Sequence, residues 1–112
     1  MKIVRVMDVP EIPNPHDVSV CALHASEHIQ MEYLLLQPGE ELKKHVASVD
    51  VYLYVLAGPG IVEVGDERQE VNVDTLVEIP AQAPHRLLNQ GNTPFRVLNV
   101  KAPRPTISTK VL

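Results

Sequence analysis

Two segments of this chain restrict the fold more than any other feature. The first, GEELKKHVASVDVYLYVLAG, runs from Gly39 to Gly58, and the second, DTLVEIPAQAPHRLLN, runs from Asp74 to Asn89. In each segment one histidine stands where a turn meets a run of apolar residues. Apolar β-branched runs favour strands, whereas proline and glycine favour turns, so each segment predicts a strand, a turn and a strand.

The rest of the chain repeats this pattern of short apolar runs separated by prolines and glycines. A helix over residues 25–36 is the weaker interpretation, because Pro38 follows and no capping residue accompanies an apolar face. Alternation predicts strands over residues 2–9, 18–24, 27–36, 49–56, 61–64, 68–73, 75–79, 85–88 and 95–101. Many short strands with such turns are typical of an all-β sandwich or barrel.

Composition narrows the class of protein. The chain has 112 residues, 45% hydrophobic and 21% charged, which is ordinary for one globular domain. Its net charge of −4 argues against a nucleic-acid partner, which would need a basic surface. The longest apolar run is too short to span a membrane, and the first residues do not resemble a secretory signal. A single cysteine, Cys21, fits a reducing cytoplasm and is expected to be an inert buried thiol.

The two segments resemble the paired motifs of the cupin superfamily. In the first motif Gly39, His45 and Gly58 match, while Ala47 stands at the second histidine position and Val51 at the glutamate position. In the second motif Pro80, His85 and Asn89 match, while Asp74 and Gln82 stand where glycines are usual. The resemblance implies a single antiparallel jelly-roll (cupin) β-barrel over residues 18–102. An N-terminal strand and proline-rich connector (1–17) would precede it, and a tail (103–112) would follow.

The resemblance also implies a place for a metal. Cupin sites use two histidines and a glutamate from the first motif and one histidine from the second, which suits Mn, Fe, Ni, Zn or Cu. Here only His45 and His85 remain. Asp50, one residue before the glutamate position, is the first candidate for a further ligand, and His24 or His28 are others. We therefore expect at most weak binding of a divalent metal by His45, His85 and Asp50.

A small polar molecule in the barrel centre is the alternative occupant. The expected ligand-binding residues are the two motif histidines, three tyrosines whose hydroxyls could orient a ligand, and the motif asparagine: His45, His85, Tyr33, Tyr52, Tyr54 and Asn89. Each also has a structural interpretation, since strand tyrosines often pack in the core and Asn89 can hold a turn. His16, His24 and His28 are expected at the surface or in turns.

Three functions follow from these residues. The first, which we favour, is a binding protein, because the loss of two metal ligands damages catalysis more than binding. The second is a metal-dependent enzyme such as an oxygenase, isomerase or lyase, and the third is a structural role. The resemblance and the apolar edge strands further predict a homodimer.

Overall fold

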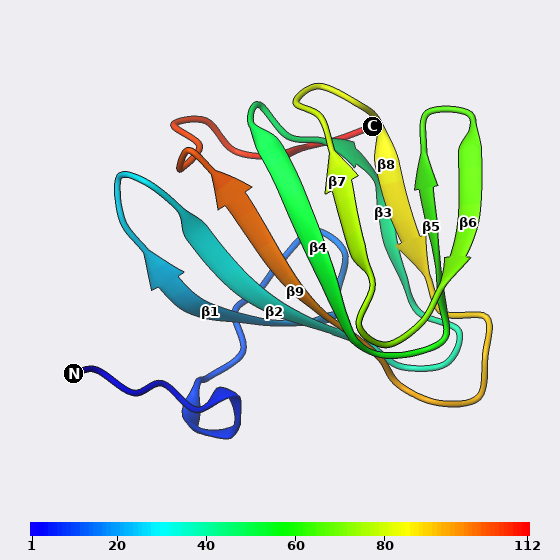
Figure 1. Ribbon diagram of the computed structural model, residues 1–112, viewed down its shortest axis with the longest axis horizontal. Coiled ribbons are helices and arrows are strands. Elements are labelled where there is room, and N and C mark those ends of the chain that lie inside the picture. Colours follow the sequence, from blue (N-terminus) through cyan, green and yellow to red (C-terminus); the bar gives the residue numbers. More distant parts are fainter.

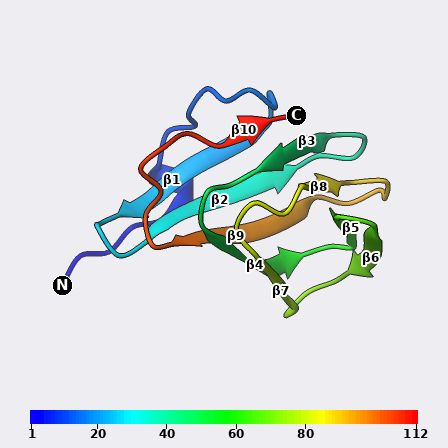
Figure 2. The same ribbon diagram turned by 90° about the horizontal axis from the view of Figure 1, so that it is seen from above.

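The computed structural model describes the whole chain, Met1–Leu112, and contains two five-stranded antiparallel sheets that face each other (Figures 1 and 2). One sheet has the order β1-β2-β9-β4-β7, with β1 at Ser19–Ala25, β2 at Gln30–Leu36, β9 at Phe95–Ala102, β4 at Asp50–Ala57 and β7 at Leu76–Ile79. The other has the order β10-β3-β8-β5-β6, with β10 at Lys110–Val111, β3 at Glu41–Val46, β8 at His85–Leu88, β5 at Gly60–Val64 and β6 at Glu67–Val71. The predicted all-β jelly roll is confirmed.

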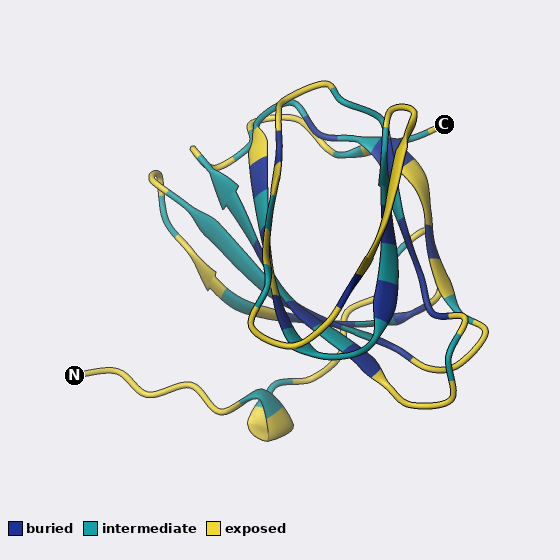
Figure 3. Ribbon diagram, turned by 45° about the vertical axis from the view of Figure 1, so that its right-hand side comes forward, coloured by how far each residue is buried: buried dark blue, intermediate teal, exposed yellow.

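Strand alternation places the core between the sheets. On β4 the odd-numbered residues Val51, Leu53 and Val55 are buried, and on β9 Phe95 and Val97 are buried in the same way. These residues join a cluster of 15 buried apolar side chains contributed by both sheets. Burial of apolar area is the main source of stability in such a fold. Figure 3 shows the buried positions along the strands and the exposed ones along the N-terminal segment.

The N-terminal segment corrects one expectation. No strand forms over residues 2–9; instead Val6–Asp8 make a short 3-10 helix, η1, and Met1, Ile3 and Met7 are exposed. The sequence of this segment does alternate, but no neighbouring strand lies beside it to form hydrogen bonds. A strand without such a neighbour is unstable. The tail, in contrast, is tied down, because β10 pairs with β3.

Asp74 and Gln82, which stand at two motif positions where glycine is usual, adopt the left-handed backbone conformation that favours glycine. Asp74 has a φ of 60° and Gln82 a φ of 68°, both in the left-handed region. Non-glycine residues adopt this region at a cost, so the turns before and after β7 retain the geometry of a glycine-containing motif.

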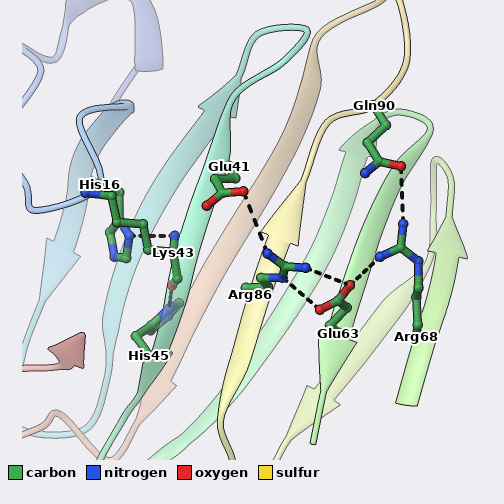
Figure 4. A network of polar contacts seen from close by, with 8 residues as sticks. All are labelled: His16, Glu41, Lys43, His45, Glu63, Arg68, Arg86 and Gln90. Atoms are coloured by element: carbon green, nitrogen blue, oxygen red, sulfur yellow. Dashed lines mark hydrogen bonds and ion pairs between the residues drawn. The ribbon is translucent and has the colours of Figure 1, made fainter. Parts of the chain in front are cut away.

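A charged cluster on the outside of the second sheet fixes the strand that carries His85. Glu63 on β5 accepts hydrogen bonds from Arg86 Nε at 2.7 Å and from Arg68, and Arg68 also reaches Gln90 (Figure 4). Because Arg86 points outward, its neighbour His85 points toward the interior.

Candidate functional site

A β-bulge on β3 turns His45 inward. Leu42 pairs with Leu87 and His45 pairs with His85, so three steps along β3 match two steps along β8. In a regular strand Leu42 and His45 would face opposite sides, but the extra residue brings both side chains to the interior. Both are 6% exposed. The bulge therefore places an imidazole in the core directly beside the one on β8.

His45 and His85 form a buried pair. Their ring centroids lie 4.0 Å apart at an interplanar angle of 57°. His45 Nδ1 lies 2.6 Å from the Lys43 carbonyl oxygen, and His85 Nδ1 lies 2.9 Å from the Ala83 carbonyl oxygen. A carbonyl only accepts, so each Nδ1 carries the proton and each Nε2 carries a lone pair in the neutral ring. Neither Nε2 hydrogen-bonds within the protein.

A third imidazole, His16, joins the pair from the N-terminal connector. Its ring centroid lies 5.0 Å from that of His45, edge to face. Its Nδ1 accepts a hydrogen bond of 2.8 Å from the Lys43 N–H, so the ring proton lies on Nε2. Figure 4 shows both rings bound to the main chain of Lys43. His16 is thus a donor at the nitrogen where His45 is an acceptor.

Asn14 holds the connector in the shape that delivers His16. Its side-chain amide donates to the carbonyl of Val18 at 2.7 Å, and its Oδ1 accepts from the N–H of His16 at 3.1 Å. Asp17, with a φ of 55°, completes the turn into β1. Asparagine favours such local loops because its short amide can replace a main-chain partner.

Polar side chains on β2 and β9 form the facing wall. Glu32 and Asn99 are register partners, and both lie on the inward side of their strands. Lys101 Nζ lies 3.9 Å from Glu32 Oε1 and donates to Thr109 Oγ1 at 2.9 Å. Asn99 Oδ1 is buried and has no hydrogen-bond partner. Buried polar atoms are nearly always paired, so this carbonyl oxygen marks a place for a donor.

These groups surround a cavity of about 220 Å³. His45 and His16 lie on one side of it, and His85 packs behind His45 rather than lining it. The other lining side chains are a mixture of polar and apolar groups that includes Glu32, Asn99, Lys101, Thr109, Val20, Leu34 and Leu42. We call this space the inner cavity.

Burial controls the charge of the three imidazoles. It lowers the pKa of His45 to about 4, helped by the neighbouring His85 and opposed by the hydrogen bond to the Lys43 carbonyl. Burial also lowers the pKa of His85 and of His16, and the Lys101 ammonium adds to the effect at all three rings. Burial removes water from the charged imidazolium, which disfavours protonation and lowers the pKa. All three rings are therefore neutral at pH 7, while Lys101 is a cation.

The expected metal ligand Asp50 does not reach the histidines. It is exposed, and its Oδ1 accepts a hydrogen bond of 2.9 Å from the N–H of Ala81. Strand parity explains the outcome, because Val51 faces inward at 2% exposure and the preceding residue must face outward. Asp50 thus joins β4 to the loop after β7. His24 and His28 are exposed and also lie outside the inner cavity.

The three tyrosines and Asn89 also lie elsewhere. Tyr33 accepts a hydrogen bond of 2.6 Å from Arg96 Nε, Tyr54 donates to Asp74 at 3.1 Å, and Tyr52 alternates with the buried residues of β4. All three occupy the outward positions of their strands, so their hydroxyls do not line the inner cavity. The side-chain amide of Asn89 donates to the carbonyls of Leu36 and Thr93 at 2.9 and 2.8 Å and accepts from the N–H of Gly91. Both of its N–H groups are therefore used within the protein and do not bind a ligand.

The residues present do not fit the metal site of a complete cupin. Ala47 and Val51 are buried apolar side chains at the two replaced ligand positions, and no group of three histidine, cysteine, aspartate or glutamate side chains is arranged to hold a metal ion. Glu32 is paired with Lys101, and the Nε2 of His16 carries a proton. The donor set is two imidazole lone pairs, whereas protein metal sites normally supply three or more ligands.

Sequence reasoning missed His16, Glu32, Asn99 and Lys101. The last three had a usable signal, because they continue the inward parity of the core-facing residues Leu34, Phe95 and Val97. A polar residue in such a register points into the barrel. His16 had no comparable signal, since its place depends on a loop.

Comparison with known proteins agrees with this architecture. The profile of the family described as Cupin domain matches residues 32–101. The polyketide synthase protein TcmJ of Streptomyces glaucescens is 33% identical over 79 residues, which are 67% of this chain and 53% of TcmJ. This chain spans about half the length of the curated relatives it matches.

Solved structures with the same fold extend the comparison. The protein TT1209 from Thermus thermophilus has a TM-score of 0.80 and 31% identity, covering 94% of this chain and all of its own. The polyketide cyclase RemF from Streptomyces resistomycificus has a TM-score of 0.85 and 20% identity, covering 100% of this chain and 85% of its own. The second likeness concerns the fold alone.

Proposed function

Because this chain belongs to the cupin domain family, we propose that it binds a small polar organic molecule in the inner cavity. The observation that carries the proposal is the buried Asn99 Oδ1, which has no partner and belongs to a residue that lines the same cavity as His45, whose Nε2 is free. Leaving such groups unsatisfied costs free energy, and a ligand with matching hydrogen atoms recovers it.

The hydrogen-bonding groups of the inner cavity describe the ligand. His45 Nε2 and Asn99 Oδ1 accept, whereas His16 Nε2–H and the Lys101 ammonium donate. A molecule that carries both a hydroxyl and a carbonyl would satisfy both kinds of group. Ligand pockets typically enclose about 300–1,000 Å³, so the enclosed part of the ligand is smaller than a drug-sized molecule.

One relative supports an oxygen-rich ligand. TcmJ, which is 33% identical over 67% of this chain, is a polyketide synthase protein. Polyketide chains carry alternating carbonyl and hydroxyl groups, which are the groups that the inner cavity would recognise. We extend to this chain only the chemical class, a small molecule with neighbouring hydroxyl and carbonyl groups.

Salicylamide, a neutral molecule with one hydroxyl beside one carbonyl, is a suitable probe. We expect it to shift the imidazole nitrogen resonances of His45 in NMR spectra. His45→Asn keeps a donor for the Lys43 carbonyl but removes Nε2, and it should weaken binding by about tenfold. The control His24→Asn removes an exposed imidazole and should leave the affinity unchanged. Unchanged affinity in His45→Asn would contradict the proposal.

A metal-dependent enzyme remains the second candidate because of the two free Nε2 atoms. The measurement that separates the candidates is elemental analysis of protein purified without a metal-affinity tag, before and after treatment with a chelator. We expect the protein to contain no stoichiometric transition metal. Near-stoichiometric metal that disappears in the double variant His45→Ala, His85→Ala would replace the first candidate with the second.

A further inference from the structure

A second cavity of about 460 Å³ lies beneath the C-terminal tail. It shares Pro15, His16, Lys101 and Thr109 with the inner cavity, so these four residues separate two adjoining spaces. The rest of its wall comes mainly from the tail, residues 104–109. We call it the outer cavity.

The walls of the outer cavity are held in place. β10 pairs with β3, and the N–H of Leu112 donates to the Lys44 carbonyl at 2.9 Å. Thr109 receives the hydrogen bond from Lys101. The tail is therefore fastened at its end, from Thr109 to Leu112, and its start continues from β9, so residues 104–108 are held at both ends.

The outer cavity is positive although the protein is acidic. Lys101 and Arg104 line it, and none of its lining residues is an aspartate or a glutamate, whereas the whole chain has a net charge of −4. Arg104 forms no ion pair, whereas Lys101 is paired with Glu32 at 3.9 Å. A guanidinium without a carboxylate partner, beside an ammonium, favours an anion.

Neutral donors complete the wall. Thr106, Ser108 and Thr109 contribute hydroxyls, and His16 carries its proton on Nε2. Hydroxyl and imidazole N–H groups can donate hydrogen bonds to a carboxylate that a guanidinium holds. His16 is shared by both cavities, so one molecule could contact the outer wall and the inner wall together.

We propose that the outer cavity binds the carboxylate of the molecule whose hydroxyl and carbonyl groups occupy the inner cavity, with Arg104 and Lys101 as the recognising cations. The substrate class is thereby narrowed to a small hydroxylated organic acid. This inference rests on the proposed function, which places the hydroxyl and carbonyl groups of the ligand in the inner cavity. It makes Arg104, which lies outside both cupin motifs, a residue that determines specificity.

The test compares salicylamide with 4-carbamoyl-3-hydroxybenzoate, which keeps the hydroxyl and the amide carbonyl and adds a carboxylate. In calorimetric titrations we expect the carboxylated probe to bind about tenfold more tightly, and its affinity to fall as salt is added. Arg104→Gln should weaken binding of the carboxylated probe by about fivefold and leave salicylamide unchanged, because an exposed guanidinium contributes a modest charge interaction. Arg5→Gln, at an exposed arginine outside the cavity, is the matched control and should change neither affinity.

The outcomes separate the two proposals. Equal affinities for the two probes, or equal effects of Arg104→Gln on both, would overturn the carboxylate site and leave the inner-cavity function standing. Binding of the carboxylated probe that depends on Arg104 but does not shift the His45 resonances would support the anion site and contradict the inner-cavity function. If neither probe binds at millimolar concentration, both proposals fail.

Discussion

At the scale of single residues, His45 combines burial, neutrality and a fixed tautomer. Its Nδ1–H is bound by the Lys43 carbonyl, and its pKa is lowered to about 4 by burial. An imidazole of this kind is a weak base but a dependable hydrogen-bond acceptor at neutral pH. This property suits recognition of a hydroxyl better than proton abstraction.

The lowered pKa predicts a pH-dependent stability. In the unfolded chain His45 binds a proton near its ordinary pKa of 6.5, whereas in the folded protein it does so only near 4. Between these values the unfolded state holds more protons, so the free energy of unfolding falls as the pH drops from about 6.5 to 4, by roughly 3 kcal/mol at most from this residue. The pKa values of His85 and His16 shift in the same direction.

Urea unfolding of the wild type and of His45→Asn at several pH values between 7 and 5 checks this expectation. The variant should lose less stability than the wild type over that range, and His24→Asn should follow the wild type. Parallel pH profiles for the wild type and His45→Asn would show that His45 is protonated equally well in both states.

At the scale of elements, most strands were predictable, but the strand expected over residues 2–9 does not form, and neither β10 nor the contacts with the loops were predicted. Runs such as VDVYLYVL predicted β4 within a residue, because apolar alternation reports burial directly. The motif spacing indicated that His45 and His85 belong to one site. The bulge at residues 43–44 changes which side of β3 its residues face. The sequence has no glycine or proline there that would have predicted it. The place of His16 depends on an asparagine-stabilised loop that packs against a strand 27 residues away.

The start of β5 illustrates how closely the two sheets approach. A Cβ added at Gly60 would lie 2.2 Å from the ring of Phe95, which is fully buried. Gly60→Ala should therefore destabilise the protein by roughly 1–3 kcal/mol, because the ring can move only by disturbing the core. Gly91→Ala is the matched control, since its added methyl would meet its nearest atom at 3.6 Å. Thermal denaturation measures both, and equal melting temperatures for the two variants would contradict the packing argument.

At the scale of the whole molecule, the barrel leaves one apolar outer surface on its first sheet. Tyr54 and Leu76 are register partners on β4 and β7, exposed by 39% and 54%. β7 is the last strand of that sheet, and an uncovered edge strand with apolar neighbours favours association with another chain.

The structure contains no helix with the length and hydrophobicity of a membrane span.

We propose that this surface pairs two copies of the chain. Light scattering should then give twice the chain mass of 12.4 kDa at micromolar concentration. Leu76→Glu should shift the protein to the monomer, because a charge at the interface loses hydration without gaining a partner. Met7→Glu, at an exposed methionine on η1, should remain dimeric. A wild-type protein that is monomeric at every concentration would contradict the proposal.

The hydrogen bonds at Lys43 have a consequence for how this site could change over time. Both imidazoles, His16 and His45, are anchored by main-chain atoms of this residue, and its side chain has no part in either bond. The lysine side chain fastens the connector separately, because its Nζ donates to the Pro15 carbonyl at 3.2 Å. Replacement of Lys43 by a non-proline residue would therefore keep the two imidazole bonds and lose this third one, whereas proline would also remove the N–H that holds His16.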